Sequence, residues 1–217
     1  MSVSIPLFPL GLVLFPHMPL PLHIFEERYR VMMRDCQENG TGFGIVGLQD
    51  GLESGGGPAR PYAVGTLAQL RRVEELEDGR FNILVVGASR FRVSGISTRR
   101  PYLTAHVEWL RDGSGDGARS QRLAARVATL FQRYATALRE LADESAAEID
   151  LPDDPELLSY LVAASLQVDN RHKQPLLEMD DADTRLAGCV RLLGRELVLL
   201  SRRLAHRNTP LEAVSRN

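Results

Sequence analysis

Apolar and polar residues follow two different periods along this chain. From about residue 42 to residue 110 the pattern is that of β-strands, with alternation most regular over 89–96 and 102–110. Further strands are predicted over 42–49, 62–76 and 80–87, and Asp78-Gly79 between two β-prone runs indicates a hairpin. The Gly/Pro/Ser-rich segment 50–61 is predicted to be a loop. Several short strands at regular spacing predict a barrel-like β-domain.

The opening stretch from Ile5 to Phe25 has no charged residue, which raises the question of a membrane helix or a signal peptide. Its five prolines exclude a continuous helix, and it has neither a basic start nor a small-residue cleavage site. We therefore expect two short buried strands, 5–10 and 12–16, followed by a helix over 26–40 that stops at Gly40. One apolar face of that helix is predicted to contain Tyr29, Met32, Met33 and Cys36.

Beyond a Gly-rich linker the period becomes helical. Helices are predicted over 120–142, 153–168 and 182–205, with Pro155 in a first turn. The apolar stripe of the first helix is Leu123, Val127, Leu130, Tyr134, Leu138 and Leu141, and that of the last is Leu186, Val190, Leu193, Leu197, Leu200 and Leu204. A packed helical bundle is favoured over a coiled coil at this length. The predicted domains are 1–111 (β-rich), 112–119 (linker), 120–206 (helical bundle) and 207–217 (a frayed tail), an α+β fold class.

Composition and charge are those of a soluble globular protein. The chain has 217 residues, 44% of them hydrophobic, and a net charge of −2 that is not strongly divided between the two halves. Cys36 and Cys189 are far apart in sequence and are interpreted as reduced, buried thiols in a cytoplasmic protein. The only lysine is Lys173, so any mechanism that requires a lysine must use that residue.

No catalytic, metal-binding or cofactor-binding pattern is found. Residues 42–47 match G-x-G-x-x-G, but they follow a helix and begin a strand, so close packing within a strand is the better interpretation. His172 and Lys173 are interpreted as a solvated turn between helices, with acid–base chemistry as the alternative. The acidic residues Asp180, Asp181 and Asp183 are expected to cap the last helix, with cation binding as the alternative. We therefore expect no enzyme activity, no cofactor and no metal.

Nucleic-acid binding is weighed separately, because small β-domains often bind RNA. Arginines cluster in the predicted β-region at positions 71, 72, 90, 92, 99 and 100. Glu74, Glu75, Glu77 and Asp78 lie beside the first pair, and no aromatic residues are interleaved for base stacking. RNA binding is therefore disfavoured.

The opening residues resemble a known family. Pro6–Leu10 (PLFPL), Val13–Pro16 (VLFP) and Pro21–Tyr29 (PLHIFEERY) are similar to the start of the Lon protease N-terminal, substrate-binding domain. The resemblance continues through "FGIV", "VGTLAQL", "DGRFNILVVGASRFRV" and "KQPLLEMDDADTRL", and covers nearly the whole chain. The match implies a PUA-like β-domain of barrel type followed by a helical bundle, and a stand-alone member without the ATPase and peptidase domains.

The resemblance also implies binding of unfolded or partner polypeptides in the cytoplasm, without a membrane, and a link to proteolysis or quality control; it gives no oligomeric state. The peptide-binding candidates are Phe25, Glu27, Arg28 and Tyr29, at the junction of strand and helix. For Phe25 and Tyr29 the competing interpretation is core packing, and for Glu27 and Arg28 it is a solvated helix face. PUA domains proper bind RNA, so RNA binding through Arg90, Arg92, Arg99 and Arg100 stays open as the alternative.

Overall fold

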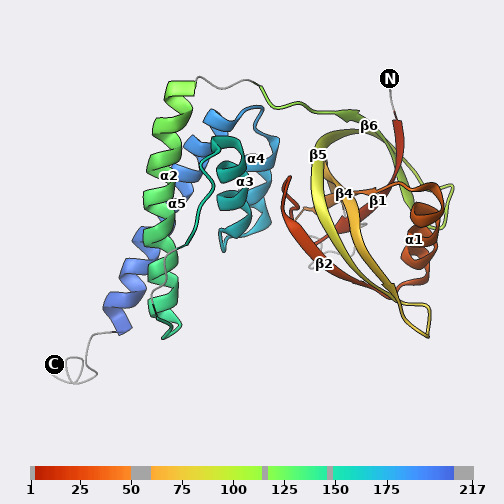
Figure 1. Ribbon diagram of the computed structural model, residues 1–217, viewed down its shortest axis with the longest axis horizontal. Helices are drawn as coiled ribbons and strands as arrows, with labels where there is room; N and C mark the ends of the chain where they lie inside the picture. The colour runs from red at the N-terminus through yellow and green to blue at the C-terminus, as the bar shows by residue number, and fades with distance from the viewer. Residues whose placement is uncertain (1–2, 50–59, 114–116, 146–148, 208–217) are drawn as a thin grey trace. The chain divides into compact units, whose positions relative to one another are not determined.

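A computed structural model describes residues 3–49, 60–113, 117–145 and 149–207 (Figure 1). The chain forms two compact units. The sheet unit comprises Met1–Gly113 and Ala163–Asp180, and the helical unit comprises Ser114–Val162 and Asp181–Asn217. A mixed sheet with five helices confirms the predicted α+β class, whereas barrel-like closure and a C-terminal bundle stay predictions.

The sheet has the strand order β2-β5-β4-β3-β1-β6, and β5 pairs with β6 as well. Its strands are β1 (Val3–Leu10), β2 (Pro19–Ile24), β3 (Phe43–Leu48), β4 (Pro61–Glu75), β5 (Phe81–Ser97) and β6 (Leu103–Trp109). Among the described strands, only the β1–β3 pair is parallel, and the other pairs are antiparallel. The predicted hairpin at Asp78-Gly79 is confirmed, with Gly79 at φ 74° and Leu76 N donating to Arg80 O at 2.8 Å. The two strands predicted over 80–96 are one long strand, β5, which continues through Gly87.

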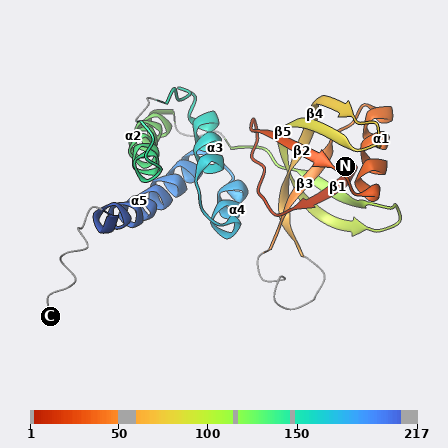
Figure 2. The same cartoon turned by 90° about the horizontal axis from the view of Figure 1, so that it is seen from below.

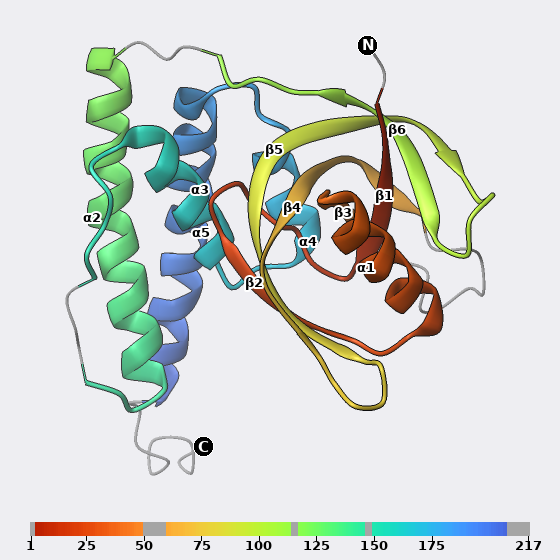
Figure 3. The ribbon, with the colours of Figure 1, turned by 45° about the vertical axis from the view of Figure 1, so that its right-hand side comes forward.

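Helix α1 (Glu27–Asn39) packs against one face of the sheet (Figure 3). Its buried side chains are the four that the sequence predicts: Tyr29, Met32, Met33 and Cys36. Gly40 ends the helix in a left-handed conformation, φ 61°, and its N–H donates to Gln37 O. The helix prediction is therefore confirmed at both ends to within one residue.

The prediction of a second opening strand over 12–16 is wrong. Val13, Leu14 and Phe15 are buried as expected, but they form no ladder; Thr66 Oγ1 donates instead to Leu14 O at 2.6 Å. The chain then turns at His17, φ 66°, and forms β2 over residues that the sequence assigned to the entry of α1. A buried apolar run has the same composition whether or not it pairs as a strand, so the pattern could not separate the two.

Helix α4 (Asn170–Glu178) belongs to the sheet unit and corrects the interpretation of His172 and Lys173 as a turn. Lys173 is half-buried, and its Nζ donates to Ala164 O at 2.8 Å. Gln174 Nε2 donates to Val64 O of β4 at 3.0 Å, and Asn170 Nδ2 donates to Gly11 O at 2.7 Å. Through these hydrogen bonds, α4 is joined to β4 and to the segment that follows β1.

In the helical unit, α2 (Gly117–Leu141) and α5 (Ala182–Arg207) lie side by side (Figure 2) and run in the same direction (Figure 1). Ser120 bonds Asp183 at their N-terminal ends, and Arg207 donates to Glu140 O at their C-terminal ends. Helix α3 (Pro155–Ser165) begins at the expected proline, with Asp154 Oδ1 accepting from Leu157 N at 2.7 Å. Asp181 caps α5 as predicted, accepting from Thr184 N at 2.7 Å.

The buried face of α2 agrees with the predicted stripe at Val127 and Tyr134 and differs from it elsewhere. Its buried residues are Ser120, Ala124, Val127, Phe131 and Tyr134, whereas the predicted leucines are only half-buried. In α5, Leu186, Leu193 and Leu200 are buried as expected. The predicted loop 50–61 and the tail after residue 206 lie almost wholly outside the described residues.

Candidate functional site

An exposed aromatic residue marks the junction between β2 and α1. Ile24, the last residue of β2, is buried, but Phe25 is 62% exposed. The Phe25 ring stacks on the His23 imidazole, with centroids 6.2 Å apart and planes 24° apart. Core packing, the competing interpretation for Phe25, is therefore wrong. An aromatic ring this exposed keeps most of its apolar area in water, which favours contact with a partner.

Charged side chains surround Phe25. Arg28 pairs with Glu26 at 2.8 Å, and Glu27 pairs with Arg30 at 2.9 Å. From the β4–β5 turn, Arg80 Nη1 lies 3.3 Å from His23 Nε2, while His23 Nδ1 lies 2.8 Å from Asn82 Oδ1. We call His23, Phe25, Glu26, Arg28 and Arg80 the Phe25 surface.

Tyr29 differs from the other three predicted peptide-binding residues, because it is buried in the core of the sheet unit. Its ring lies 4.1 Å from that of Phe8, centroid to centroid, and Arg28 Cζ lies 4.5 Å above it. Burial raises the pKa of Tyr29, and the Arg28 charge partly opposes that rise. The structure therefore brings Phe25, Glu27 and Arg28 to one exposed corner and places Tyr29 beneath it, where it supports the Arg28 side chain.

The outer edge of β2 offers few hydrogen-bond donors. Among the described strands β2 pairs only with β5, and Met18 O accepts from Gly87 N at 3.0 Å. Because backbone groups alternate in direction along a strand, Pro19 and Pro21 face away from β5. Proline has no N–H, so an incoming strand would find carbonyl acceptors there but would lack donors.

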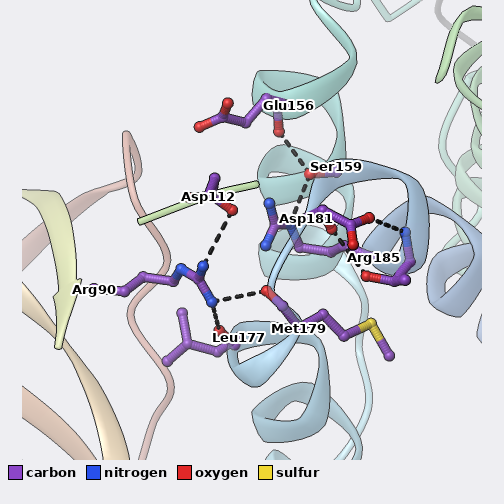
Figure 4. A network of polar contacts seen from close by, with 9 residues as sticks. Arg90, Asp112, Glu156, Ser159, Leu177, Met179, Asp181 and Arg185 are labelled. Carbon is purple, nitrogen blue, oxygen red and sulfur yellow. Dashed lines mark hydrogen bonds and ion pairs between the residues drawn. The ribbon is translucent and has the colours of Figure 1, made fainter. Parts of the chain in front are cut away.

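Arg90 is not part of an exposed arginine face, which corrects the prediction. It is 1% exposed, and its Nη1 donates to Leu177 O at 2.7 Å and to Met179 O at 2.8 Å (Figure 4). Its Nη2 lies 3.2 Å from Asp112 Oδ1. Both Nη atoms of this guanidinium are engaged within the sheet unit, which leaves RNA no access to it.

The other three arginines of the RNA hypothesis are exposed. Arg92 lies opposite Glu108 in the β5–β6 register. Arg100 donates to Asp35 Oδ2 and to the Tyr102 hydroxyl, both at 2.7 Å. Acidic neighbours thus accompany two of the three, and RNA binding remains a prediction that these contacts do not favour.

Sequence reasoning missed His23, Arg80 and Asn82 as neighbours of Phe25. The Asp-Gly signal located the turn that contains Arg80, but no local pattern shows that this turn lies beside the start of α1. The missing information is the pairing of β2 with β5, which brings His23 opposite Asn82.

The buried nucleophiles of the chain are poorly suited to catalysis. Burial raises the pKa of the Cys36 thiol to about 11 and that of the Cys189 thiol to about 12. The thiolate is the reactive form, so both are weak nucleophiles at neutral pH. Burial lowers the pKa of Lys173, whose amine donates to a backbone carbonyl.

Within residues 3–49, 60–113, 117–145 and 149–207, no group of three or more His, Cys, Asp or Glu side chains is placed so that it could hold a metal ion. No described helix combines the length and the hydropathy that a membrane span requires.

Comparison with known proteins adds independent information. Lon protease of Escherichia coli (strain K12) is 26% identical over 199 residues, which cover 91% of this chain and 25% of that protein. Lon protease of Desulfovibrio desulfuricans is 29% identical over 196 residues, which cover 89% of this chain and 22% of that protein. The chain thus spans about a quarter of the length of these relatives.

Solved structures agree with the sequence matches. The Lon N-terminal domain protein from Xanthomonas campestris has a TM-score of 0.63 and 27% identity, covering 88% of this chain and 98% of that one. The N-terminal domain of Mycobacterium avium complex Lon protease, 19% identical, shares the fold, with a TM-score of 0.62 and coverage of 90% and 98%. The family model of the ATP-dependent protease La (LON) substrate-binding domain matches residues 4–195, so the chain belongs to the Lon substrate-binding domain family.

Proposed function

We propose that this chain is a non-catalytic recognition module that binds exposed segments of unfolded or partner polypeptides through the Phe25 surface. Membership of the Lon substrate-binding domain family supports a substrate-recognition role. The observation that carries the choice of site is the exposure of Phe25 between a buried strand end and a packed helix. Participation in cytoplasmic proteolysis or quality control forms part of the same proposal.

The proposed mode of binding uses side chains instead of strand addition. Phe25 provides an apolar anchor, and burying such a ring fully contributes about 1.5 to 3 kcal/mol. Arg28 and Arg80 flank it with guanidinium donors for the carbonyl groups of a bound segment. The outer edge of β2, where Pro19 and Pro21 remove two donors, makes β-strand addition the weaker alternative.

The experiment measures binding of a fluorescently labelled, permanently unfolded polypeptide, reduced and carboxymethylated α-lactalbumin, by anisotropy. We expect Phe25→Ala to weaken binding about tenfold or more, because the anchor is lost. Ile96→Ala is the matched control, since Ile96 is a 46% exposed apolar residue of the same unit. Both variants are expected to keep the wild-type thermal midpoint.

Equal affinity of Phe25→Ala and wild type would remove the Phe25 surface from the proposal. A structured RNA hairpin titrated at two salt concentrations provides the second arm. Tight RNA binding that falls steeply with salt, together with no binding of the polypeptide, would overturn the recognition of polypeptides in favour of RNA.

A further inference from the structure

A groove follows the seam between the C-terminal halves of α2 and α5, in the helical unit. It encloses about 520 Å³ and is lined by residues that include Arg133, Ala137, Leu197, Val198, Ser201 and Leu204. Val198 is 52% exposed and its neighbour Leu199 is 45% exposed. Two adjacent helices that leave apolar side chains in their shared groove present the surface on which a third helix packs.

Both helices that form this groove are rich in arginine, and Arg133 is one of the lining residues. On α2 arginines follow a spacing of three, four and seven residues, which keeps them on one helix face: Arg119, Arg122, Arg126 and Arg133. On α5 the corresponding exposed residues are Arg191, Arg195 and Arg202. Arg202 follows Val198 by one turn, so the two residues lie on the same face of α5.

The charge of these two helices contrasts with that of the whole chain. Helix α2 contains five arginines and one glutamate, and α5 contains six arginines, one aspartate and one glutamate. Each helix therefore has a net charge of +4, and the two together have +8. The whole chain has a net charge of −2. Among the described residues, no carboxylate lies within ion-pair distance of Arg126, Arg133 or Arg202. The charges of these three arginines are therefore available to a partner, whereas Arg119, Arg195 and Arg207 are in ion pairs.

We propose that the α2–α5 groove binds an amphipathic helix of a partner protein whose polar face is acidic. The apolar face of such a helix would cover Val198 and Leu204, and its carboxylates would meet the arginines of both helices. Glu140, the acidic lining residue in the last turn of α2, would repel carboxylates there, which directs the acidic positions toward Arg133 and Arg202.

Charge and hydrophobicity together select this occupant. A second copy of the chain using the same surface would bring arginines against arginines, which opposes self-association. Nucleic acid would satisfy the arginines but would leave Val198 and Leu204 without an apolar partner. This proposal uses a different surface from the Phe25 surface and does not depend on it.

The test uses the full chain and a designed 18-residue peptide with leucines at i, i+3, i+4 and i+7 spacing and glutamates on its other face. A scrambled peptide of the same composition removes the apolar face, and a version with lysine in place of glutamate removes the charge complementarity. We expect the designed peptide to bind at least tenfold more tightly than either control by fluorescence anisotropy.

Variants then locate the binding. Val198→Glu, and separately the double variant Arg133→Glu/Arg202→Glu, are each expected to weaken binding at least fivefold. Arg72→Glu, an exposed arginine of β4 in the sheet unit, is the matched control and should leave the affinity unchanged. Circular dichroism verifies the fold, and Val198→Ser replaces Val198→Glu if the latter unfolds.

Several results would overturn the proposal: equal binding of the scrambled peptide, or full affinity in both groove variants. A 20-nucleotide single-stranded RNA that binds more tightly than the peptide and is insensitive to Val198→Glu would assign the arginines to nucleic acid. A dimer in sedimentation that dissociates in Val198→Glu would assign the groove to a second copy.

Discussion

Among the described residues, each compact unit buries one arginine, and the two side chains are held in different ways (Figure 4). In the sheet unit, Arg90 donates to Leu177 O and Met179 O at the C-terminal end of α4, more than eighty residues away in sequence. It also pairs with the Asp112 carboxylate. In the helical unit, Arg185 Nε donates to Ser159 Oγ at 2.8 Å, and its Cζ lies 3.7 Å from the Tyr160 ring centroid. Arg90 thus has a carboxylate and two carbonyls as partners, whereas Arg185 packs on an aromatic face.

The difference shows what each arginine does for its unit. Arg90 joins β5 to the segment that ends α4, so it fixes the late segment of the sheet unit. Arg185 joins the first turn of α5 to α3 through its hydrogen bond to Ser159 Oγ. The same Ser159 hydroxyl donates to Glu156 O, one turn earlier in α3, at 2.6 Å. A fork of donors can hold several chain segments together, which a lysine cannot do with the same geometry.

The largest expected change in stability comes from Arg90→Met, which tests whether the sheet unit depends on the hydrogen bonds of the Arg90 guanidinium. Leu177 O, Met179 O and the Asp112 carboxylate would lose their donors in the interior, and we expect a loss of about 3 to 5 kcal/mol in the free energy of unfolding. Urea denaturation followed by fluorescence of Trp109, the only tryptophan and a residue of β6, measures it. Arg92→Met, two residues along β5 and exposed, should change stability by less than about 0.5 kcal/mol. Similar values for the two variants would refute the role of Arg90.

Arg185→Met is expected to lower the free energy of unfolding by about 2 to 3 kcal/mol, because Ser159 Oγ would lose its donor and the Tyr160 ring would lose the cation beside it. Urea denaturation followed by circular dichroism at 222 nm, where the long helices α2 and α5 contribute strongly, measures this loss. The comparison between the units fails if Arg185→Met costs as much as Arg90→Met.

Glycines extend the comparison to backbone packing. In β3, a Cβ on Gly44 would lie 2.6 Å from Phe91 Cζ and 2.9 Å from Ile5 Cδ1, inside the core of the sheet unit. We therefore expect Gly44→Ala to destabilise by about 1 to 3 kcal/mol, a cost typical of overpacking. Trp109 fluorescence in urea provides the measurement, since Trp109 packs edge-on against Phe91. An unchanged midpoint would show that the strand tolerates the methyl group.

The same substitution in α5 should have the opposite sign. A Cβ on Gly194 would meet no atom within 4 Å, and the residue lies in the interior of a long helix. Gly194→Ala should therefore stabilise the helical unit by about 0.5 to 1 kcal/mol, because alanine restricts the unfolded chain and favours helix. A higher urea midpoint at 222 nm is the expected result, and a lower one would contradict the open space around Gly194.

Local patterns predicted most of the elements. Helical spacing located α1, α2, α3 and α5, and proline and aspartate signals located the starts of α3 and α5. Apolar and β-prone runs located β3 and β4, period-two alternation located β6, and the Asp-Gly signal located the β4–β5 hairpin. These predictions succeed because burial of one face and capping of helix ends depend on residues that are neighbours in sequence.

The candidate site was predicted only in part. The family motif directed attention to Phe25, Glu27 and Arg28, which do share an exposed corner, but not to His23 and Arg80, which complete it. Arg90 was assigned to the surface because alternation along β5 opposes it to apolar Phe91. Its burial depends on α4, which covers that position from a segment more than eighty residues away.

The sequence by itself determined the family, the α+β class and the identity of the buried face of α1, because these follow from motifs and from periodicity. Only the tertiary structure decided that residues 12–16 run as buried coil, that Ala163–Asp180 joins the sheet unit, and that Arg90 is interior while Phe25 is exposed. The physical reason is the same in each case. A side chain is buried by whatever packs over it, and a backbone group pairs with whichever donor or acceptor lies nearest, and both neighbours come from distant parts of the chain.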